Sequence, residues 1–237
     1  MFSFLFSGYY FDHMLAELLF ILPAAIFAIW ASARVNSSFN KYSSVMSRRG
    51  ITGAQAAQAI LQAAGVYDVR VEYVKGNLSD HFDPKANVIR LSDSVYSSSS
   101  VAAIGVAAHE AGHAIQYARA YGPIKLRSAI IPVTQVASNI ALPLILLGFI
   151  FQISFLVPVG IICFSAAAVF QLITLPVEFN ASKRAIEMLD GQNILYDDEL
   201  AGAKKVLSAA AMTYVAALAS ALASLLRIIF IFGRRND

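Results

Sequence analysis

The sequence has few charged residues and a single cysteine. Aspartate, glutamate, lysine and arginine make up 14% of the 237 residues, well below the ~25% of an ordinary soluble domain. The lone Cys163 excludes an intrachain disulfide and lies in an apolar stretch, where thiol chemistry is not expected. No basic stripe with interleaved aromatic residues occurs, so nucleic acid is not an expected partner. The scarcity of charge, together with 58% hydrophobic residues, predicts a membrane protein.

Long stretches lack charge altogether or nearly so. Met14 to Ala33 is apolar apart from Glu17, and no lysine or arginine precedes it, so we interpret it as an uncleaved anchor; a signal peptide cleaved after Ala33 is the alternative. Residues 128–177 carry no charged side chain over fifty residues, which suits two helices joined by a tight turn near Gln152. With a last apolar stretch at 208–226, the sequence predicts four membrane spans.

The basic residues are unevenly distributed. Of the 18 lysines and arginines, 15 fall between Arg34 and Arg127 or between Lys183 and Lys205. The positive-inside rule therefore predicts that these segments are cytoplasmic and that the N-terminus lies outside. Arg234 and Arg235 oppose this orientation but are outnumbered.

The main chemical motif is His-Glu-Ala-Gly-His, from His109 to His113, in an alanine-rich stretch without proline. On a helix, two histidines four residues apart share one face and can hold one zinc ion from adjacent turns. Glu110 can then act as the general base towards a water at the metal. Gly112 leaves room for another element to approach this helix. The alternative is a buried helix whose histidines only hydrogen-bond to neighbours.

A catalytic zinc needs a third protein ligand and one open position. Glu178 follows the uncharged stretch and returns to the side of the membrane that the histidine motif occupies, so it is the predicted third ligand. Asp93 is an alternative ligand that lacks a comparable context. The alternative is an acidic residue that only interacts with a helix dipole. The other histidines suit the metal less, because His13 precedes the first span and His81 lies in a predicted turn, where it could contact a substrate.

Short elements precede the motif. We expect a helix over Ala54–Ala64 that Gly65 ends, a strand over Val69–Val74, and a second strand over Asn87–Ser92. Asp80–Pro84 is rich in turn residues. We predict that the second strand is an edge strand along the active-site cleft, where an extended peptide could pair with its backbone.

Four segments resemble the YugP-like neutral zinc metallopeptidases of bacterial membranes. They occur in that family's order, over nearly the whole chain, at 80–84, 106–116, 175–182 and 209–217. The resemblance implies a zinc peptidase of the gluzincin type that acts on a peptide or protein substrate and is bound to the lipid bilayer of the bacterial cell membrane. Ser182 departs from the aspartate of related membrane peptidases, so the resemblance does not say which residue orients the zinc histidines.

The resemblance also implies roles for individual residues. It places His109, His113 and Glu178 on the zinc and makes Glu110 the general base. An oxyanion donor is needed as well, and Arg184 and Tyr214 are the candidates.

Two other functions fit parts of the pattern. An intramembrane protease of the site-2 type is suggested by Leu189-Asp190-Gly191, although prolines do not precede it and a helix C-terminus explains it as well. A non-catalytic membrane scaffold with a structural zinc is the other alternative, although structural sites usually fill all four positions with protein ligands.

The predicted fold class is an α-helical multi-pass membrane protein with a small α+β zincin-like metallopeptidase domain. We expect five parts: a membrane anchor at 1–33, a soluble part with the small sheet and the histidine helix at 34–127, a transmembrane hairpin at 128–177, a soluble helix with the third ligand at 178–207, and a C-terminal transmembrane helix and tail at 208–237. The oligomeric state does not follow from the sequence.

Overall fold

The computed structural model describes residues 14–77 and 79–233. His13, Arg234 and Arg235 therefore lie outside the described residues. The chain divides into two compact units. The helix unit comprises the described parts of Met1–Ala31, Leu126–Thr174 and Tyr214–Asp237, and the sheet unit comprises Ser32–Lys125 and Leu175–Thr213.

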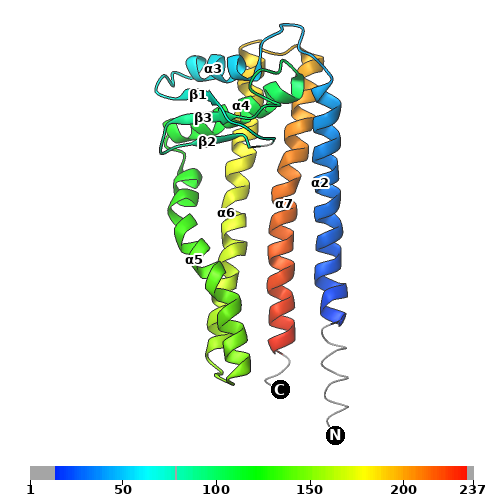
Figure 1. The fold of residues 1–237 in the computed structure, drawn as a ribbon, viewed down its shortest axis with the longest axis vertical. Coiled ribbons are helices and arrows are strands. Elements are labelled where there is room, and N and C mark those ends of the chain that lie inside the picture. Colours follow the sequence, from blue (N-terminus) through cyan, green and yellow to red (C-terminus); the bar gives the residue numbers. More distant parts are fainter. Residues whose placement is uncertain (1–13, 78, 234–237) are drawn as a thin grey trace. The chain divides into compact units, whose positions relative to one another are not determined.

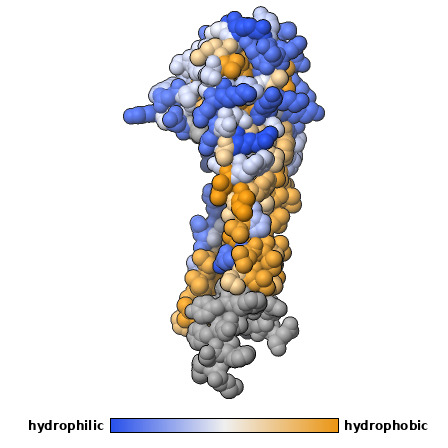
Figure 2. All heavy atoms as spheres, turned by 90° about the vertical axis from the view of Figure 1, so that its right-hand side faces the viewer, coloured by the Kyte–Doolittle hydropathy of each residue, from blue (hydrophilic) through white to orange (hydrophobic). Residues whose placement is uncertain are grey.

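Four long apolar helices run through the described residues (Figure 1). They are the helix over Met14–Ser43, which contains η1 (Glu17–Ile21) and α2 (Leu22–Ser43), then α5 (Gly122–Ile150), α6 (Leu156–Gly191) and α7 (Asp197–Gly233). Each is long and apolar enough to cross a membrane. Hydrophobic residues cover much of the visible surface of the helix unit, whereas hydrophilic residues cover most of the sheet unit (Figure 2).

Within the helix unit, α5 and α6 pack closely. A Cβ at Gly160 would lie 2.5 Å from Ile145 Cγ1 and 2.9 Å from the carbonyl oxygen of Ala141, so only glycine allows this approach. The turn between the two helices contains Gln152, near which the tight turn is predicted, and the φ of this residue is 55°. Elsewhere in the unit, Glu17 and Arg227, the charges that interrupt the first and last apolar stretches, form an ion pair of 2.5 Å.

The sheet unit contains α3 (Gly53–Ala63) and strands β1 (Arg70–Tyr73), β2 (His81–Asp83) and β3 (Val88–Leu91). Thr52 caps α3 through a reciprocal pair of hydrogen bonds with Gln55, and Gly65, at a φ of 73°, follows the helix end as predicted. The strand order is β1-β3-β2, with β1 parallel and β2 antiparallel to β3.

The strand order corrects the predicted substrate strand. β3, which is the expected edge strand over Asn87–Ser92, is the central strand and has a paired neighbour on each side. Its backbone groups are therefore used within the sheet. Part of the predicted turn at Asp80–Pro84 is instead the edge strand β2, which Asp80 anchors by accepting hydrogen bonds from the amide and hydroxyl of Ser92.

The helix α4 (Val101–Ala118) is the centre of the sheet unit, with 14 of its 18 residues buried. Ser100 begins it by accepting a hydrogen bond from the Ala103 amide, which satisfies a backbone donor that the first turn leaves free. Six alanines and two glycines are among the buried residues, so neighbouring elements can approach the helix backbone closely.

Candidate metal centre

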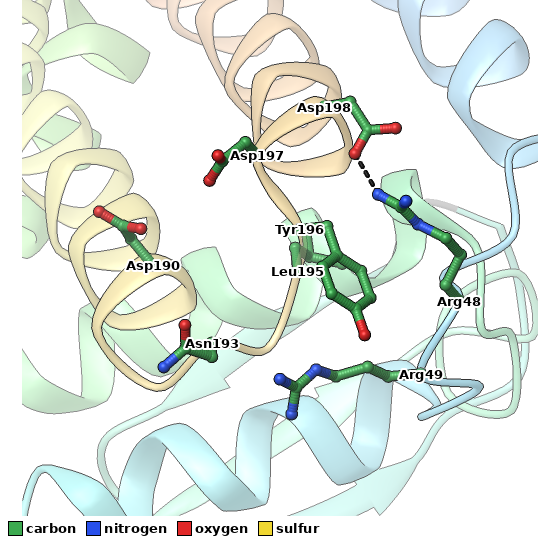
Figure 3. A pocket seen from close by; sticks show the side chains of 8 residues that line it. All are labelled: Arg48, Arg49, Asp190, Asn193, Leu195, Tyr196, Asp197 and Asp198. Carbon is green, nitrogen blue, oxygen red and sulfur yellow. Dashed lines mark hydrogen bonds and ion pairs between the residues drawn. The ribbon is translucent and has the colours of Figure 1, made fainter.

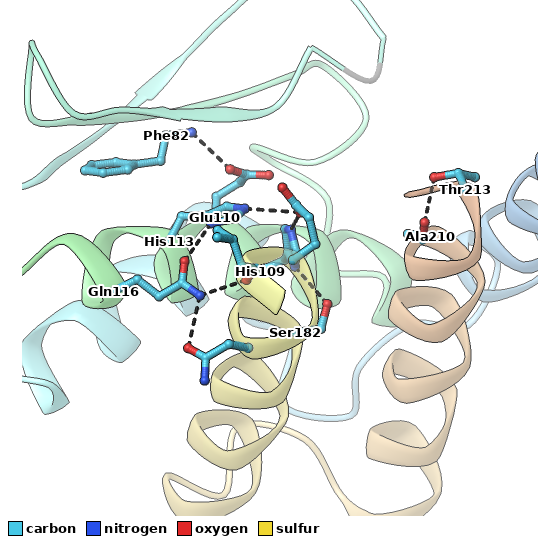
Figure 4. Close-up of polar contacts among 11 residues, drawn as sticks. Phe82, His109, Glu110, His113, Gln116, Ser182, Ala210 and Thr213 are labelled. Atoms are coloured by element: carbon cyan, nitrogen blue, oxygen red, sulfur yellow. Dashed lines mark hydrogen bonds and ion pairs between the residues drawn. The ribbon is translucent and has the colours of Figure 1, made fainter. Parts of the chain in front are cut away.

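Two histidines of α4, His109 and His113 (Figure 4), converge with one glutamate of α6 in the sheet unit. Glu178 Oε2 lies 3.2 Å from His109 Nε2 and 3.5 Å from His113 Nε2. One ligand atom of each residue lies within 4.8 Å of the other two. The side chains of His109, His113 and Glu178 are 14%, 11% and 3% exposed, so these polar atoms meet in a largely buried place.

The second ring nitrogen of each histidine has its own partner. His109 Nδ1 lies 3.1 Å from Ser182 Oγ, and His113 Nδ1 lies 3.1 Å from Gln116 Oε1. Because the amide carbonyl of Gln116 can only accept, Nδ1 of His113 carries the proton in this pair. A neutral His113 held in this way has its Nε2 lone pair free for a metal.

The orientation of Gln116 is itself fixed by α6. Its amide nitrogen donates to the carbonyl oxygen of Val177 at 2.8 Å and to Asn180 Oδ1 at 3.0 Å. Arg184 Nε donates to the same Asn180 oxygen at 2.8 Å. Since both amide hydrogens of Gln116 have acceptors on α6, its carbonyl oxygen is left to face His113.

Gly112 allows α4 and α6 to come together at the site. A Cβ on Gly112 would lie 2.5 Å from the carbonyl oxygen of Ala181. This distance is shorter than any ordinary contact of a Cβ atom. The predicted close approach of another element at this glycine is confirmed. The missing side chain therefore helps to bring Glu178 and Ser182 to the histidines.

Glu110 is buried beside the cluster and contacts the sheet. Its Oε2 accepts a hydrogen bond of 3.0 Å from the backbone amide of Phe82 on β2. The ring of Phe82 also packs edge-on against Tyr117 of α4, with 5.8 Å between the ring centroids. These contacts hold one carboxylate oxygen of Glu110 and leave the other, Oε1, available.

The electrostatics of the cluster favour a cation. Burial lowers the pKa of His113, but the hydrogen bond with Glu178 and the negative charges of Glu110 and Glu178 outweigh it, so the pKa lies above its ordinary value. A raised pKa of a buried histidine indicates a negative electrostatic potential around the imidazole. The same potential attracts a metal cation.

The donor set fits zinc. Imidazole nitrogen and carboxylate oxygen are common zinc ligands, and three protein ligands with one open position are typical of catalytic zinc sites. His109, His113 and Glu178 supply two such nitrogens and one oxygen. No fourth histidine, cysteine, aspartate or glutamate joins the group in the part of the chain that the structure describes.

The other predicted site residues have different positions. His81 is exposed on β2, with Nδ1 at 2.8 Å from the carbonyl oxygen of Ser79. Arg184 contacts Asn180, as described, and its guanidinium lies 5.9 Å from the ring centroid of Tyr121. Tyr214 is on α7, in the helix unit.

Asp190 does not belong to the metal cluster. It lines a separate hollow of about 280 Å³ in the sheet unit (Figure 3), where Arg48 lies over the Tyr196 ring at 4.2 Å and forms an ion pair with Asp198. The Leu-Asp-Gly sequence stands at the end of α6, and Gly191 is the last helical residue. The structure therefore agrees with the helix-end interpretation of this sequence.

Ser182 and Gln116 are the contacts that sequence reasoning did not assign. Gln116 is three residues after His113 and Ser182 is four after Glu178, so each shares a helix face with a predicted ligand. That spacing was a usable signal. Ser182, which stands where related membrane peptidases have aspartate, is the residue beside His109 Nδ1.

Comparisons with known proteins identify the family of the chain. A family described as "putative neutral zinc metallopeptidase" matches residues 17–233. The chain is 49% identical over 220 residues to the "putative membrane protease YugP" of Bacillus subtilis (strain 168), with 92% of this chain and 98% of that protein covered. No solved structure matches the chain. The resemblance inferred from the motifs is thus confirmed, and the chain belongs to the family of neutral zinc metallopeptidases.

Proposed function

We propose that the protein is a membrane-embedded zinc endopeptidase in which His109, His113 and Glu178 hold the metal and Glu110 is the general base. The observation that carries this proposal is the meeting of three buried ligand atoms beside a fourth, separately held carboxylate. When bound, zinc would lower the pKa of a coordinated water and polarise the carbonyl of a peptide bond.

The protein's own groups then move the proton. Glu110 Oε1 accepts a proton from water at the site while the Phe82 amide holds Oε2, and Glu110 later gives this proton to the leaving amine. Ser182 and Gln116 keep the two imidazoles in place. We keep Arg184 and Tyr214 as proposed oxyanion donors.

The edge strand β2 replaces β3 as the proposed place of the substrate. The Phe82 amide points away from β3 and towards Glu110, so the free edge of β2 lies beside the general base. An extended peptide that pairs with this edge would be held near the cluster largely without regard to its side chains. We propose that this pairing of an edge strand with the histidine helix is a zincin-like arrangement. The exposed His81 of β2 would then contact the peptide.

The open fourth position favours catalysis over a structural zinc. The distinguishing variant is Glu110→Gln, which keeps the shape of the side chain and removes the base. With an unfolded soluble protein such as casein as the substrate, we expect internal cleavage by the zinc-loaded wild type and a loss of about 10²- to 10⁴-fold in the variant, at equal zinc content.

The matched control is Glu187→Gln on the exposed face of α6, where Glu187 pairs with Lys183 at 3.7 Å. It should cleave like the wild type. Full activity of Glu110→Gln would refute the proposed mechanism, and absence of cleavage by the zinc-loaded wild type would support the scaffold.

The four apolar helices and the name of the relative indicate association with a membrane. We further propose four crossings with the sheet unit in the cytoplasm, from the skew of the basic residues. In a Cys163→Ala background, an impermeant thiol reagent added to intact cells should label Gln152→Cys and not Lys85→Cys. The opposite labelling would reverse the orientation and leave the catalytic proposal unchanged.

A further inference from the structure

The helix unit contains a hollow of about 400 Å³ between α5 and α6. Five of its eight lining residues are polar although both helices are apolar overall, and all eight lie in this unit. The polar ones are Thr134, Gln135, Ser138 and Asn139 of α5 and Gln171 of α6. None of the eight is charged.

The amides in the hollow are not used by the fold. No hydrogen bond joins the side chains of Gln135, Asn139 or Gln171 to any other residue within 14–77 and 79–233. The hydroxyl groups of the unit behave differently: Thr134 donates to the carbonyl of Ile130 at 3.0 Å, and Ser165 donates to that of Ile162 at 2.7 Å. The amides therefore keep both donors and acceptors for another molecule.

Pro143 lies one turn after Asn139 in α5. Proline has no amide hydrogen, so the carbonyl of the residue four positions earlier, Asn139, receives no hydrogen bond from it. Unpaired polar groups of this kind are costly in hydrocarbon and mark functional places in membrane helices.

The chemistry of the lining defines the ligand. The lining has no charged side chain to pair with a phosphate headgroup or a metal ion. A side-chain amide donates and accepts as a peptide bond does, so it complements uncharged polar side chains and backbone groups that a helix has released. A regular apolar helix satisfies its backbone internally and gains nothing here.

We propose that this hollow binds a transmembrane segment of a polypeptide substrate that carries uncharged polar side chains or a local break in its helix. The proposal rests on the peptidase function above and on α5 and α6 lying in the bilayer. A second copy of this chain is the competing occupant, and the oligomeric mass distinguishes it from a substrate segment in the test below.

The test uses binding and not cleavage. The Glu110→Gln protein is placed in phosphatidylcholine–phosphatidylglycerol nanodiscs with a synthetic transmembrane peptide that carries a photoreactive residue. One probe has an Asn-Gln pair at its centre, and the other is leucine throughout. We expect stronger cross-linking of the polar probe and an about tenfold loss in Gln135→Leu/Asn139→Leu/Gln171→Leu.

The matched control is Ser165→Leu, which removes a hydroxyl on α6 outside the hollow and should leave cross-linking unchanged. Equal cross-linking of the two probes, or an unchanged yield in the triple variant, would overturn the proposal. A change of oligomeric mass in the triple variant would overturn it in favour of a second copy. A lipid ester group could compete for the hollow. If more phospholipid lowered the cross-linking yield of the polar probe in the wild type and not in the triple variant, the proposal would be overturned in favour of a lipid.

Casein cleavage by the protein with an intact Glu110 separates the two proposals. One zinc per chain in the triple variant shows that its sheet unit is folded and metal-loaded. If the wild type cleaves nothing while the polar probe still cross-links through the amides, the peptidase proposal fails and the binding site stands.

Discussion

The polar side chains of the two units are treated in opposite ways. Around the metal cluster they pair with one another: Gln116 contacts His113 and Asn180, Ser182 contacts His109, and the Phe82 amide contacts Glu110. In the hollow of the helix unit, the side-chain amides form no hydrogen bond with another described residue. The comparison teaches that the metal cluster uses its polar side chains to fix its own geometry, whereas the hollow leaves its amides available.

The largest effect should come from Glu178, which contacts both histidines. Loss of a residue that only hydrogen-bonds to a metal ligand lowers metal affinity about 10- to 100-fold. Glu178→Gln changes a proposed ligand itself, so zinc affinity should fall by more than this. Glu187→Gln, on the exposed face of the same helix, should change nothing. Zinc analysis after dialysis against a weak chelator measures both, and one zinc per chain in Glu178→Gln would remove this residue from the ligand set.

The next effect should come from Gly112, where any side chain meets α6. Gly112→Ala should lower the free energy of unfolding by about 1–3 kcal/mol, because a Cβ cannot fit beside the Ala181 carbonyl. Gly122→Ala is the control, since nothing lies within 4 Å of its Cβ position. Thermal unfolding in detergent compares the two, and equal midpoints would show that the helices do not approach at Gly112.

A smaller effect is expected at Ser182, which holds one histidine from outside the ligand set. Ser182→Ala should lower zinc affinity about tenfold through the loss of a single contact. Ser182→Asp should keep or raise it, because a carboxylate accepts the Nδ1 proton more strongly. Chelator competition measures the affinities; a drop in the aspartate variant as large as in the alanine one would argue against an orienting role.

The smallest effect tests the helix unit directly. Asn139→Leu should change the free energy of unfolding by less than about 0.5 kcal/mol, since no hydrogen bond to a described residue is lost. Asn180→Leu, the same substitution in the sheet unit, should cost about 1–2 kcal/mol because Gln116 and Arg184 lose their shared partner. If the two variants unfolded alike, the difference between the units would not hold.

Local features of the fold were predictable from the sequence because they depend on near neighbours. The serines before Val101 predict the start of α4, and the spacing of His109 and His113 places both on one face. Gly112 predicts a close approach, although not by which residue. Each of these depends on a few adjacent positions.

Other features depend on contacts between distant segments. The central position of β3 follows from pairing with two strands, which the alternation within Asn87–Ser92 does not encode. Likewise α6 continues through Glu178 although the polarity of the sequence changes there, because helical hydrogen bonds form alike in apolar and polar surroundings. The partners of the histidines required knowing how α4 meets α6.

Zinc X-ray absorption spectroscopy on the purified Glu110→Gln protein tests the central claim most directly. The account predicts one zinc per chain with two imidazole rings and oxygen in its coordination shell, and loss of the imidazole signal when His109 and His113 are both replaced by alanine. A spectrum without imidazole, or zinc bound with an unchanged spectrum in the double histidine variant, would contradict it.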